Sequence, residues 1–361
     1  MHKEEIKVSE LKTKKPSKLD ALKAMSPKDR NRAIVDTLMN NAMFIIIAIA
    51  VVGIAIARPR FLSPASIINI INLTAAKLPI ALGVGGCIIL AGTDISAGRQ
   101  VGLAACIAAG LQLTTNKLFP GLAVMPIPVA LLAVLVVGAI IGFVNGFCMA
   151  KFKLHPFIVT LSTQLIVYGL VLMFMQLGTN SGQTLSGMSE AYRNFVVGTL
   201  FVVDGTAVPN YVLYSLIIAV VVWVIWNKTT FGKNMFAVGS NEDAANVSGV
   251  NVTKTIVMVF MMAGMLYALT GFFDAARIAS VNATTGLNYE ADAIAACVIG
   301  GISFVGGIGK VSGAIIGVLL LQVIFVGLNF LSVDPNLLYI VKGLIILVAC
   351  AIDMRKYLVR K

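Results

Sequence analysis

Long apolar stretches with few charged residues recur along this chain, and they constrain its fold more than any other sequence feature. An α-helix of roughly 20 apolar residues crosses a bilayer. Stretches of about this length lie near residues 41–57, 67–91, 99–114, 124–150, 157–177, 210–226, 254–273, 291–308, 311–331 and 337–353. They predict an all-α, polytopic membrane protein with about ten transmembrane helices, some of them broken or re-entrant.

The composition excludes a soluble globular domain. Hydrophobic residues make up 58% of the chain and charged residues 12%, whereas soluble domains carry about 25% charged residues. A strict alternation of apolar and polar residues is absent, so an outer-membrane β-barrel is not expected. The five cysteines lie within apolar stretches without a CxxC pair, which favours small buried side chains over disulfides or metal ligands.

Lysine and arginine are concentrated at both ends and in a few connections, and they give the chain a formal net charge of +12. Because basic segments favour the cytoplasmic side of a membrane, both termini are expected there. The sequence predicts a basic cytoplasmic tail over residues 1–33, a transmembrane domain over residues 34–354 and a basic cytoplasmic end over residues 355–361. Arg58 and Arg60 fall on the outer side and depart from this rule. Nucleic-acid binding is not expected.

The motifs of a catalytic or ATP-hydrolysing chain are missing. No G-x-x-x-x-G-K-[ST] phosphate-binding loop is present, since Val311 follows Gly309 and Lys310. The sequence also contains no metal-ligand spacing and no recognisable pair of nucleophile and base. Catalytic residues, a metal site and a cofactor held by this chain are therefore not expected. If the protein moves a solute uphill, the energy comes from a partner or from an ion gradient.

The first polar interruption separates two apolar stretches at Gly92–Gln100. An ionisable residue at membrane depth is unfavourable unless it faces a cavity or a partner, and Asp94 and Arg99 could neutralise each other there. Gly92 and Gly98 allow a helix to break, and broken helices line substrate paths in transporters. A tight cytoplasmic hairpin between two helices explains the same residues equally well.

The longest cytoplasmic connection, Asn227–Thr253, contains the signals of a short capped helix. Ser240 or Asn241 can cap it, the two acidic residues that follow suit its first turn, and Gly249 can end it. Such a helix outside the membrane could act as a lever for a soluble partner. It could also be a loop helix without a partner.

A third polar feature opens the apolar stretch near residue 291. Glu290 and Asp292 precede a run of small residues, and the glycine-rich segment Gly300–Gly309 follows. Small residues let membrane helices approach closely. The two carboxylates mark either the membrane interface or a polar entrance.

Five motifs together resemble the permease subunits of ribose- and galactose-type sugar ABC importers. They are GTDISAGRQVGLAA at 92–105, GFVNG at 142–146, HPFIVTLST at 155–163, WNKTTFGKNMFAVGSNEDAANVSGVNV at 226–252 and EADAIAACVIGGISFVGGIGKVSG at 290–313. The pair Arg99 and Gln100 looks most like the galactose/methyl-galactoside branch. Ser162 stands where relatives usually have glycine, which puts the local helix packing in question.

The resemblance implies a division of labour in a bacterial inner membrane. A soluble binding protein outside would deliver a monosaccharide, galactose or methyl galactoside first, to two permease subunits that form a homodimer. A cytoplasmic ATPase that holds ATP and Mg²⁺ would drive transport. Ribose, a nucleoside or another sugar-like solute stays open as cargo, and so does ion-coupled secondary transport.

The resemblance also implies two sets of functional residues. Residues expected to couple the connection 227–253 to the ATPase are Gly239, Asn241, Glu242, Ala244, Ala245, Ser248 and Gly249. Residues expected near the translocation pathway are Asp94, Ser96, Gly98, Arg99, Asn145, Thr160, Thr163, Asp292 and Ser303.

Overall fold

The structure of the protein is a computed structural model that describes residues 42–178 and 180–358. The chain divides into two compact units, Met1–Ile46 and Ile47–Lys361. Of the first unit, only the beginning of one helix lies in the described residues, and the architecture that follows is that of the second unit. The predicted basic tail lies outside the described residues, as does the very end of the predicted C-terminal segment.

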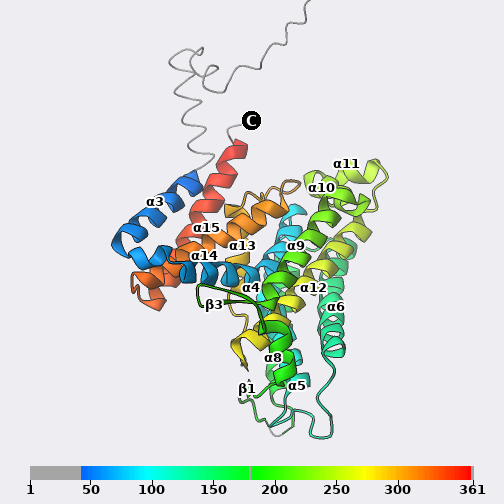
Figure 1. Cartoon of the computed structure of the whole chain (residues 1–361). Coiled ribbons are helices and arrows are strands. Elements are labelled where there is room, and N and C mark those ends of the chain that lie inside the picture. Colours follow the sequence, from blue (N-terminus) through cyan, green and yellow to red (C-terminus); the bar gives the residue numbers. More distant parts are fainter. Residues whose placement is uncertain (1–41, 179, 359–361) are drawn as a thin grey trace, which may run out of the picture. The chain divides into compact units, whose positions relative to one another are not determined.

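Helices make up most of the described chain, and the predicted all-α fold is confirmed (Figure 1). They are α3 (Ala42–Ala57), the 3-10 helix η1 (Pro59–Leu62), α4 (Pro64–Ile89), α5 (Ala97–Gln112), α6 (Ile127–Phe152), α7 (Pro156–Met175), α8 (Glu190–Val197), α9 (Asn210–Lys228), α10 (Thr230–Ser240), α11 (Glu242–Val247), α12 (Val252–Ile278), α13 (Tyr289–Ile299), α14 (Val311–Phe330) and α15 (Pro335–Leu358). The described strands are short and form antiparallel pairs, β1 (Leu185–Ser186) with β4 (Ser280–Val281) and β2 (Thr199–Val203) with β3 (Thr206–Pro209).

Among the described residues, 6 helices are long and apolar enough to cross a membrane, namely α4, α6, α7, α9, α12 and α14. Helices α3 and α5 have 16 residues each and α13 has 11. At about 1.5 Å per residue they are shorter than the roughly 30 Å of a bilayer core. In α15 the apolar part covers Asn336–Val348. Length and composition therefore confirm 6 of the predicted spans and leave the figure of about ten unconfirmed.

Left-handed backbone lies at the end of one predicted segment, 67–91, and interrupts another, 291–308. α4 ends at Ile89, and Ala91 has a φ of 56°. α13 ends at Ile299, and Gly301 and Gly306 follow with φ of 84° and 87°. A left-handed residue cannot continue a right-handed helix. The predicted apolar segment 291–308 is therefore too long, because its second half is a loop.

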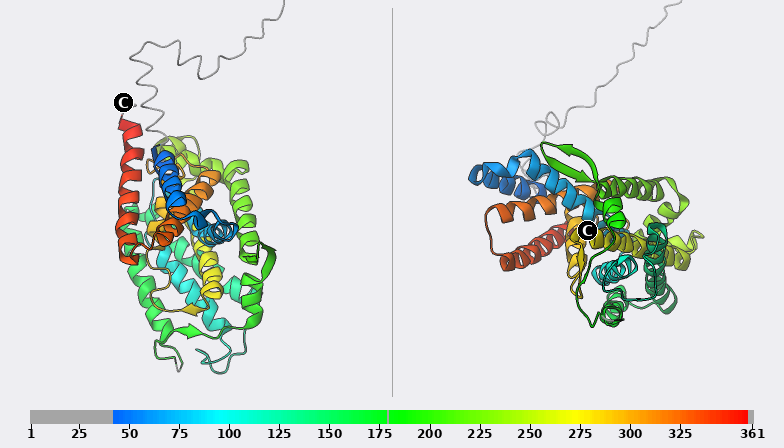
Figure 2. Two further views of the ribbon diagram at one scale, coloured as in Figure 1. Left: turned by 60° about the vertical axis from the view of Figure 1, so that its left-hand side comes forward. Right: turned by 60° about the horizontal axis from the view of Figure 1, so that its bottom comes forward.

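α12 is the central helix, since it packs against α4, α5 and α6 (Figure 2). Glycines bring the backbones of α6 and α12 together. A Cβ atom at Gly138 would lie 2.3 Å from the carbonyl oxygen of Gly264, and one at Gly142 would lie 2.1 Å from that of Phe260. Close packing of small residues stabilises helix pairs in lipid, where hydrophobic burial gives little driving force.

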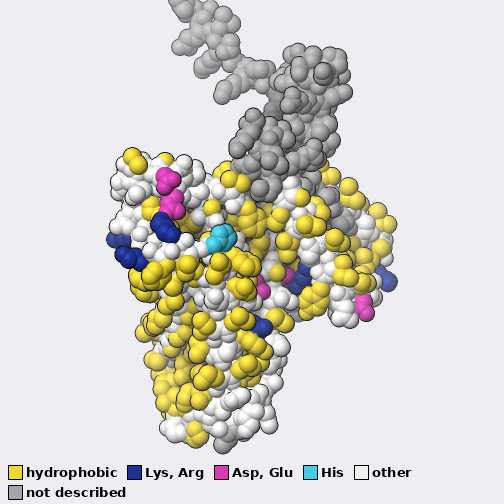
Figure 3. All heavy atoms as spheres, turned by 180° about the vertical axis from the view of Figure 1, so that it is seen from behind, with side chains coloured by type: hydrophobic (Ala, Val, Ile, Leu, Met, Phe, Trp, Pro, Cys, Tyr) yellow, Lys and Arg dark blue, Asp and Glu magenta, His cyan; other side chains and the backbone are white. Residues whose placement is uncertain are grey.

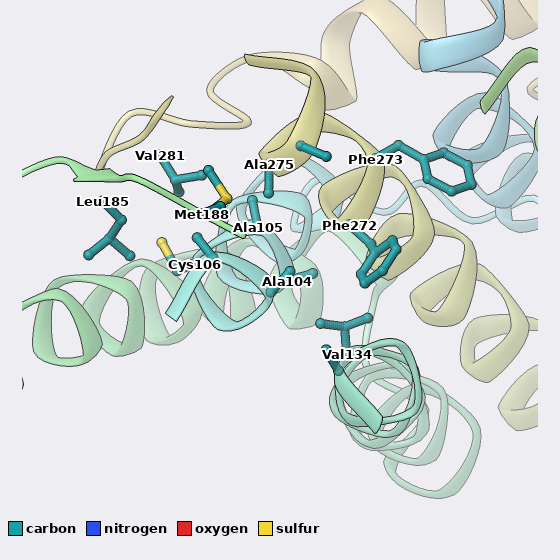
Figure 4. Packing of buried hydrophobic residues seen from close by; sticks show 14 of the residues in the cluster. Ala104, Ala105, Cys106, Val134, Leu185, Met188, Phe272, Phe273, Ala275 and Val281 are labelled. Atoms are coloured by element: carbon teal, nitrogen blue, oxygen red, sulfur yellow. The ribbon is translucent and has the colours of Figure 1, made fainter. Parts of the chain in front are cut away.

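A buried apolar cluster joins α5, α6 and α12 to two of the short strands (Figure 4). Ala104 of α5, Val134 of α6 and Phe272 of α12 are all less than 4% exposed. Leu185 of β1 pairs with Val281 of β4 and extends the cluster. The predicted outer connection is thus attached to the end of the helix bundle.

A buried tyrosine fixes α8 on the same end of the bundle. Ser189 caps this helix, and Tyr192 is fully buried and donates its hydroxyl hydrogen to the carbonyl oxygen of Phe272. Burial raises the pKa of Tyr192 above its ordinary value, so the hydroxyl stays protonated and keeps donating. α8 is therefore held on α12 by a directed contact.

Large hydrophobic side chains remain exposed along α6, α7 and α9. Figure 3 shows hydrophobic side chains gathered over much of the face seen from behind. Leu132 is 62% exposed, Leu165 67% and Leu216 58%. Soluble monomers rarely expose contiguous apolar surface of this kind, so these faces suit lipid. A group of acidic and basic side chains lies at the end that carries α10 and α11 (Figure 3).

Candidate translocation and coupling site

Polar side chains from α5, α6 and α7 meet at the break between α4 and α5. Asp94 is fully buried, and its Oδ1 accepts hydrogen bonds from the backbone N–H of Ser96 at 2.9 Å and from the Ser96 hydroxyl at 2.5 Å. The Ser96 Oγ accepts from Gln100 Nε2 at 2.9 Å and from Asn145 Nδ2 at 3.2 Å. Thr163 donates to Asn145 Oδ1 at 2.6 Å. We call Asp94, Ser96, Gln100, Asn145 and Thr163 the break cluster.

Unused hydrogen-bonding capacity remains in the break cluster. Within the described chain, Asp94 Oδ2 and Gln100 Oε1 are buried without a hydrogen-bond partner. Buried polar atoms normally find partners in protein or in ordered water. Thr160, one turn before Thr163, donates to the carbonyl oxygens of Thr93 and Pro156 and so joins α7 to the same break.

Arg99 does not neutralise Asp94, so that expectation is wrong. Its Nη1 donates to the carbonyl oxygen of Ala283 at 3.1 Å, and its guanidinium carbon lies 4.1 Å from the ring centroid of Tyr168. Gly98, one residue earlier, faces Glu290, because a Cβ atom there would lie 2.0 Å from Glu290 Oε2. Gly98 and Arg99 therefore both pack against the segment that leads into α13, and Arg99 also contacts α7. Both residues lie outside the break cluster.

Asp292 belongs to a second group of charges, which sequence reasoning largely missed. Asp274 of α12 is fully buried and pairs with Arg277 at 2.8 Å and with Lys77 of α4 at 3.8 Å. Asp292 of α13 pairs with Lys342 of α15 at 2.9 Å. We call these five residues the charged cluster. Ionisable residues inside apolar helices are expected to pair with one another.

The two parts of the charged cluster meet at a small cavity. Lys77 lies over the ring of Tyr289, and both line this cavity together with Asp292 and Gln322. Its volume is about 10 Å³, which is room for about one water molecule. In this conformation the cavity does not admit a sugar.

Ser303 shapes the loop after α13. It is 2% exposed, its N–H donates to the carbonyl oxygen of Ile308 at 3.1 Å, and its Oγ accepts from the N–H of Val305 at 3.3 Å. The side chain of Ser303 is thus part of the backbone bonding of this loop. It lies in neither of the two polar clusters.

The connection Asn227–Thr253 contains the capped helix that its sequence predicts. Asn241 Oδ1 accepts from the N–H of Ala244 at 2.8 Å, acidic residues form the first turn of α11, and Gly249 follows with a φ of 84°. Glu242 also forms an ion pair with Lys153 at the end of α6. The local prediction is confirmed, with Asn241 as the cap.

The predicted coupling residues divide between surface and interior. The exposed ones are Asn241, Glu242, Ala244, Ser248 and Gly249, and the buried ones are Gly239 and Ala245. Sequence reasoning missed Val247, which is 90% exposed. Single exposed apolar side chains are common on protein surfaces, so Val247 indicates a contact only together with the capped helix and the cleft beside it. A cleft of about 460 Å³ lies beside the helix, lined in part by Lys153 and Asp243.

No group of three or more His, Cys, Asp and Glu side chains that could hold a metal ion is found in the described part of the chain. Long apolar helices, close helix crossings and buried polar clusters at helix breaks define a class, the multi-pass membrane permeases. The particular family follows from comparison with known proteins.

A family model described as the branched-chain amino acid transport system / permease component matches residues 66–350, and the chain belongs to this family. It is 45% identical to the galactose/methyl galactoside import permease protein MglC of Haemophilus influenzae over 93% of this chain and 100% of that protein. The same permease of Escherichia coli is 42% identical, over 91% of this chain and 98% of that protein. The ribose import permease protein RbsC of Bacillus subtilis is 35% identical, over 87% and 92%. No solved structure matches the chain.

These relationships confirm the resemblance to the permease subunits of ribose- and galactose-type ABC importers. The chain is a multi-pass inner-membrane transport protein and not an enzyme. In such importers ATP hydrolysis takes place in a separate partner chain.

Proposed function

We propose that this chain translocates a monosaccharide, galactose or methyl galactoside in the first place, into the cytoplasm. The observation that carries the proposal is identity along nearly the whole chain, 45% and 42% to two galactose/methyl galactoside permeases against 35% to a ribose permease. The break cluster supports it chemically, because hydroxyl and amide groups can hydrogen-bond a neutral sugar without a compensating charge.

The proposed importer contains further chains. A sugar-binding protein outside delivers the solute, and a cytoplasmic ATPase holds ATP and Mg²⁺. A second copy of this chain completes the translocation pathway. Support for a separate ATPase is that this sequence has no phosphate-binding loop and belongs to a family of permease components. Under this proposal α3, α5, α13 and α15 complete about ten membrane segments, with both termini in the cytoplasm.

The proposed pathway includes both polar clusters. Asp94, Ser96, Asn145 and Thr163 offer hydrogen bonds at the break, with Thr160 beside them. Asp292 lies beside the small cavity between α4, α13 and α14. Separation of these helices would open the cavity to solute. Gly98, Arg99 and Ser303 would act through the packing of the neighbouring loops.

The proposed ATPase contact is the exposed side of α11 and its flanks, with Val247 as the apolar anchor. Protein interfaces combine an apolar centre with a polar rim, and Val247 with the polar residues around it fits that pattern. The cleft beside α11 gives a partner side chain room next to Asp243. The buried Gly239 and Ala245 would act by holding the helix in place.

Uptake of radiolabelled sugars in a strain that lacks this chain tests the substrate. Restoring the chain is expected to restore galactose uptake, with methyl galactoside as a strong competitor and ribose as a weak one. Restored ribose uptake without galactose uptake would assign the chain to the ribose branch. If neither sugar is taken up in the presence of the binding protein and the ATPase, the sugar proposal fails.

Replacement of Val247 tests the ATPase contact. Val247→Asp is expected to reduce the amount of ATPase recovered with the permease from detergent-solubilised membranes by about tenfold, which corresponds to roughly 1.4 kcal/mol. Val202→Asp is a matched control, since Val202 is an exposed valine of β2 in the predicted outer connection. Equal recovery of the ATPase with both variants would remove α11 from the contact.

A further inference from the structure

Three segments of backbone meet at the end of α10 without any side chain between them. The N–H of Gly307 donates to the carbonyl oxygen of Ile89 at 2.8 Å. Gly239 lies against the same oxygen, because a Cβ atom at Gly239 would be 1.8 Å from it. α4, α10 and the loop after α13 therefore touch through one carbonyl group.

Gly306 completes this contact. Its φ of 87° lies in a region that residues other than glycine rarely adopt. A Cβ atom on Gly306 would lie 2.3 Å from the carbonyl oxygen of Gly239 and 2.9 Å from the Cβ of Ala91. We call Ile89, Gly239, Gly306 and Gly307 the backbone junction.

Each segment of the backbone junction leads to a different functional part. Ile89 ends α4 just before the break that holds Asp94. Gly239 lies two residues before Asn241, the cap of α11. Gly307 belongs to the loop that connects α13, which carries Asp292, with α14. The backbone junction therefore joins the end of α10, which leads directly into α11, to the Asp94 break and to the loop after α13.

A small apolar cluster strengthens the same connection. Val238, Ala245 and Val252 form a buried group beneath α11, and Leu90 packs against it. Leu90 directly follows Ile89, so a displacement of α11 presses on the end of α4 through both contacts. Close-packed atoms transmit displacement because they leave no room for side chains to adjust.

We propose that the backbone junction transmits movement of α11 to the Asp94 break and to the loop after α13. The residues of the junction are positioning residues, because they act through packing and contact neither ATP nor sugar. The proposal rests on the proposed role of α11 as the ATPase contact. It adds a route from that contact to the polar clusters.

Gly306→Ala tests the junction, and Gly301→Ala is its matched control. Both glycines lie in the loop after α13 with nearly equal φ, 87° and 84°, but nothing lies within 4 Å of a Cβ atom at Gly301. Both variants therefore carry the strain of an alanine in the left-handed conformation. Only Gly306→Ala also places a Cβ atom against Gly239 and Ala91. Each variant is reconstituted with its ATPase and binding protein, and ATPase recovery, ATP hydrolysis and sugar transported per ATP are measured.

Gly306→Ala is expected to bind the ATPase and hydrolyse ATP while transporting at least tenfold less sugar per ATP than Gly301→Ala. Equal transport per ATP in the two variants would overturn the proposal, whether both are active or both are impaired. If Gly306→Ala does not assemble, Leu90→Ala replaces it, and a lower ratio supports the junction while an unchanged ratio overturns it. Loss of ATPase contact is measured separately with Val247→Asp, so failure of the two proposals is distinguishable.

Discussion

The two polar clusters differ in how their buried charge is stabilised. Asp94 accepts hydrogen bonds from the backbone and hydroxyl of Ser96, and no cation pairs with it in the described structure. Asp274 is paired with two cations, Lys77 and Arg277. Removing one partner of a buried ion pair leaves an uncompensated charge and strongly lowers the free energy of unfolding. Removing one member of a hydrogen-bonded polar network lowers it less.

Replacing Asp274 tests the charged cluster. Asp274→Ala leaves Lys77 and Arg277 without their counter-charge, and breaking a buried pair in this way costs about 3–5 kcal/mol. Thermal unfolding of the purified permease in detergent is expected to show this loss. Glu242→Ala breaks the exposed pair with Lys153 and is expected to change stability by about 1 kcal/mol or less. Equal losses of stability in the two variants would mean that the buried Asp274 pairs stabilise the fold no more than the exposed pair does.

Replacing Asn145 tests the break cluster. Asn145 is fully buried, donates to Ser96 and accepts from Thr163, so Asn145→Ala leaves polar partners unsatisfied at about 1–3 kcal/mol. Reduced sugar uptake at normal membrane abundance is the expected readout. Ser162→Ala is the control, because Ser162 is exposed and its hydroxyl donates to the carbonyl oxygen of Ile158 in its own helix. Equal uptake by both variants would contradict a role for the cluster.

The sequence predicts the break cluster better than the charged cluster for a physical reason. Asp94, Ser96 and Asn145 lie in motifs with recognisable glycines and polar neighbours. Lys77 is a single charge in an apolar stretch, and nothing local indicates that α4 and α12 place it beside Asp274. Arg277 lies only three residues after Asp274, but the pairing with Lys77 depends on helix packing, which cannot be deduced from a single sequence.

At the scale of elements, the sequence predicts helix ends that have local capping signals, but the length of an apolar stretch does not predict the length of the helix. The cap and the acidic first turn of α11 are local signals, and the helix forms where they predict it. The end of α13 at Ile299 depends on left-handed glycines further along the chain. The apolar stretch 291–308 contains both a short helix and a loop. Hydropathy does not separate them, because it reports side-chain polarity and not backbone conformation.

The crossing of α6 and α12 provides a prediction for a whole element. A Cβ atom at Gly142 would lie 2.1 Å from the carbonyl oxygen of Phe260, so Gly142→Ala must separate the helices and is expected to destabilise the bundle by roughly 1–3 kcal/mol. Gly169→Ala in α7 has nothing within 4 Å of its Cβ and is expected to be neutral or up to about 1 kcal/mol more stable. Unfolding curves of the two variants decide the matter, and coinciding curves would rule out a tight crossing.

At the scale of the whole molecule, the distribution of charge and the structure agree on two distinct ends. One end carries α10 and α11 with acidic and basic side chains around them (Figure 3). The other carries the pairing of β1 with β4 and the buried Tyr192 of α8. On the positive-inside rule, we propose that the first end faces the cytoplasm. Arg58 and Arg60 depart from that assignment, so it needs a direct test.

Labelling of single cysteines from outside intact cells provides this test. Ser248 follows α11 and Ser186 lies in β1, and both side chains are exposed. In a background without the partly exposed Cys148 and Cys350, Ser186→Cys is expected to react with a membrane-impermeant maleimide in intact cells. Ser248→Cys is expected to react only after the membrane is opened. The reverse pattern would turn α11 away from the cytosol and remove it from the reach of any ATPase there. The sugar pathway would then need another source of energy, and the backbone junction would have no movement to transmit.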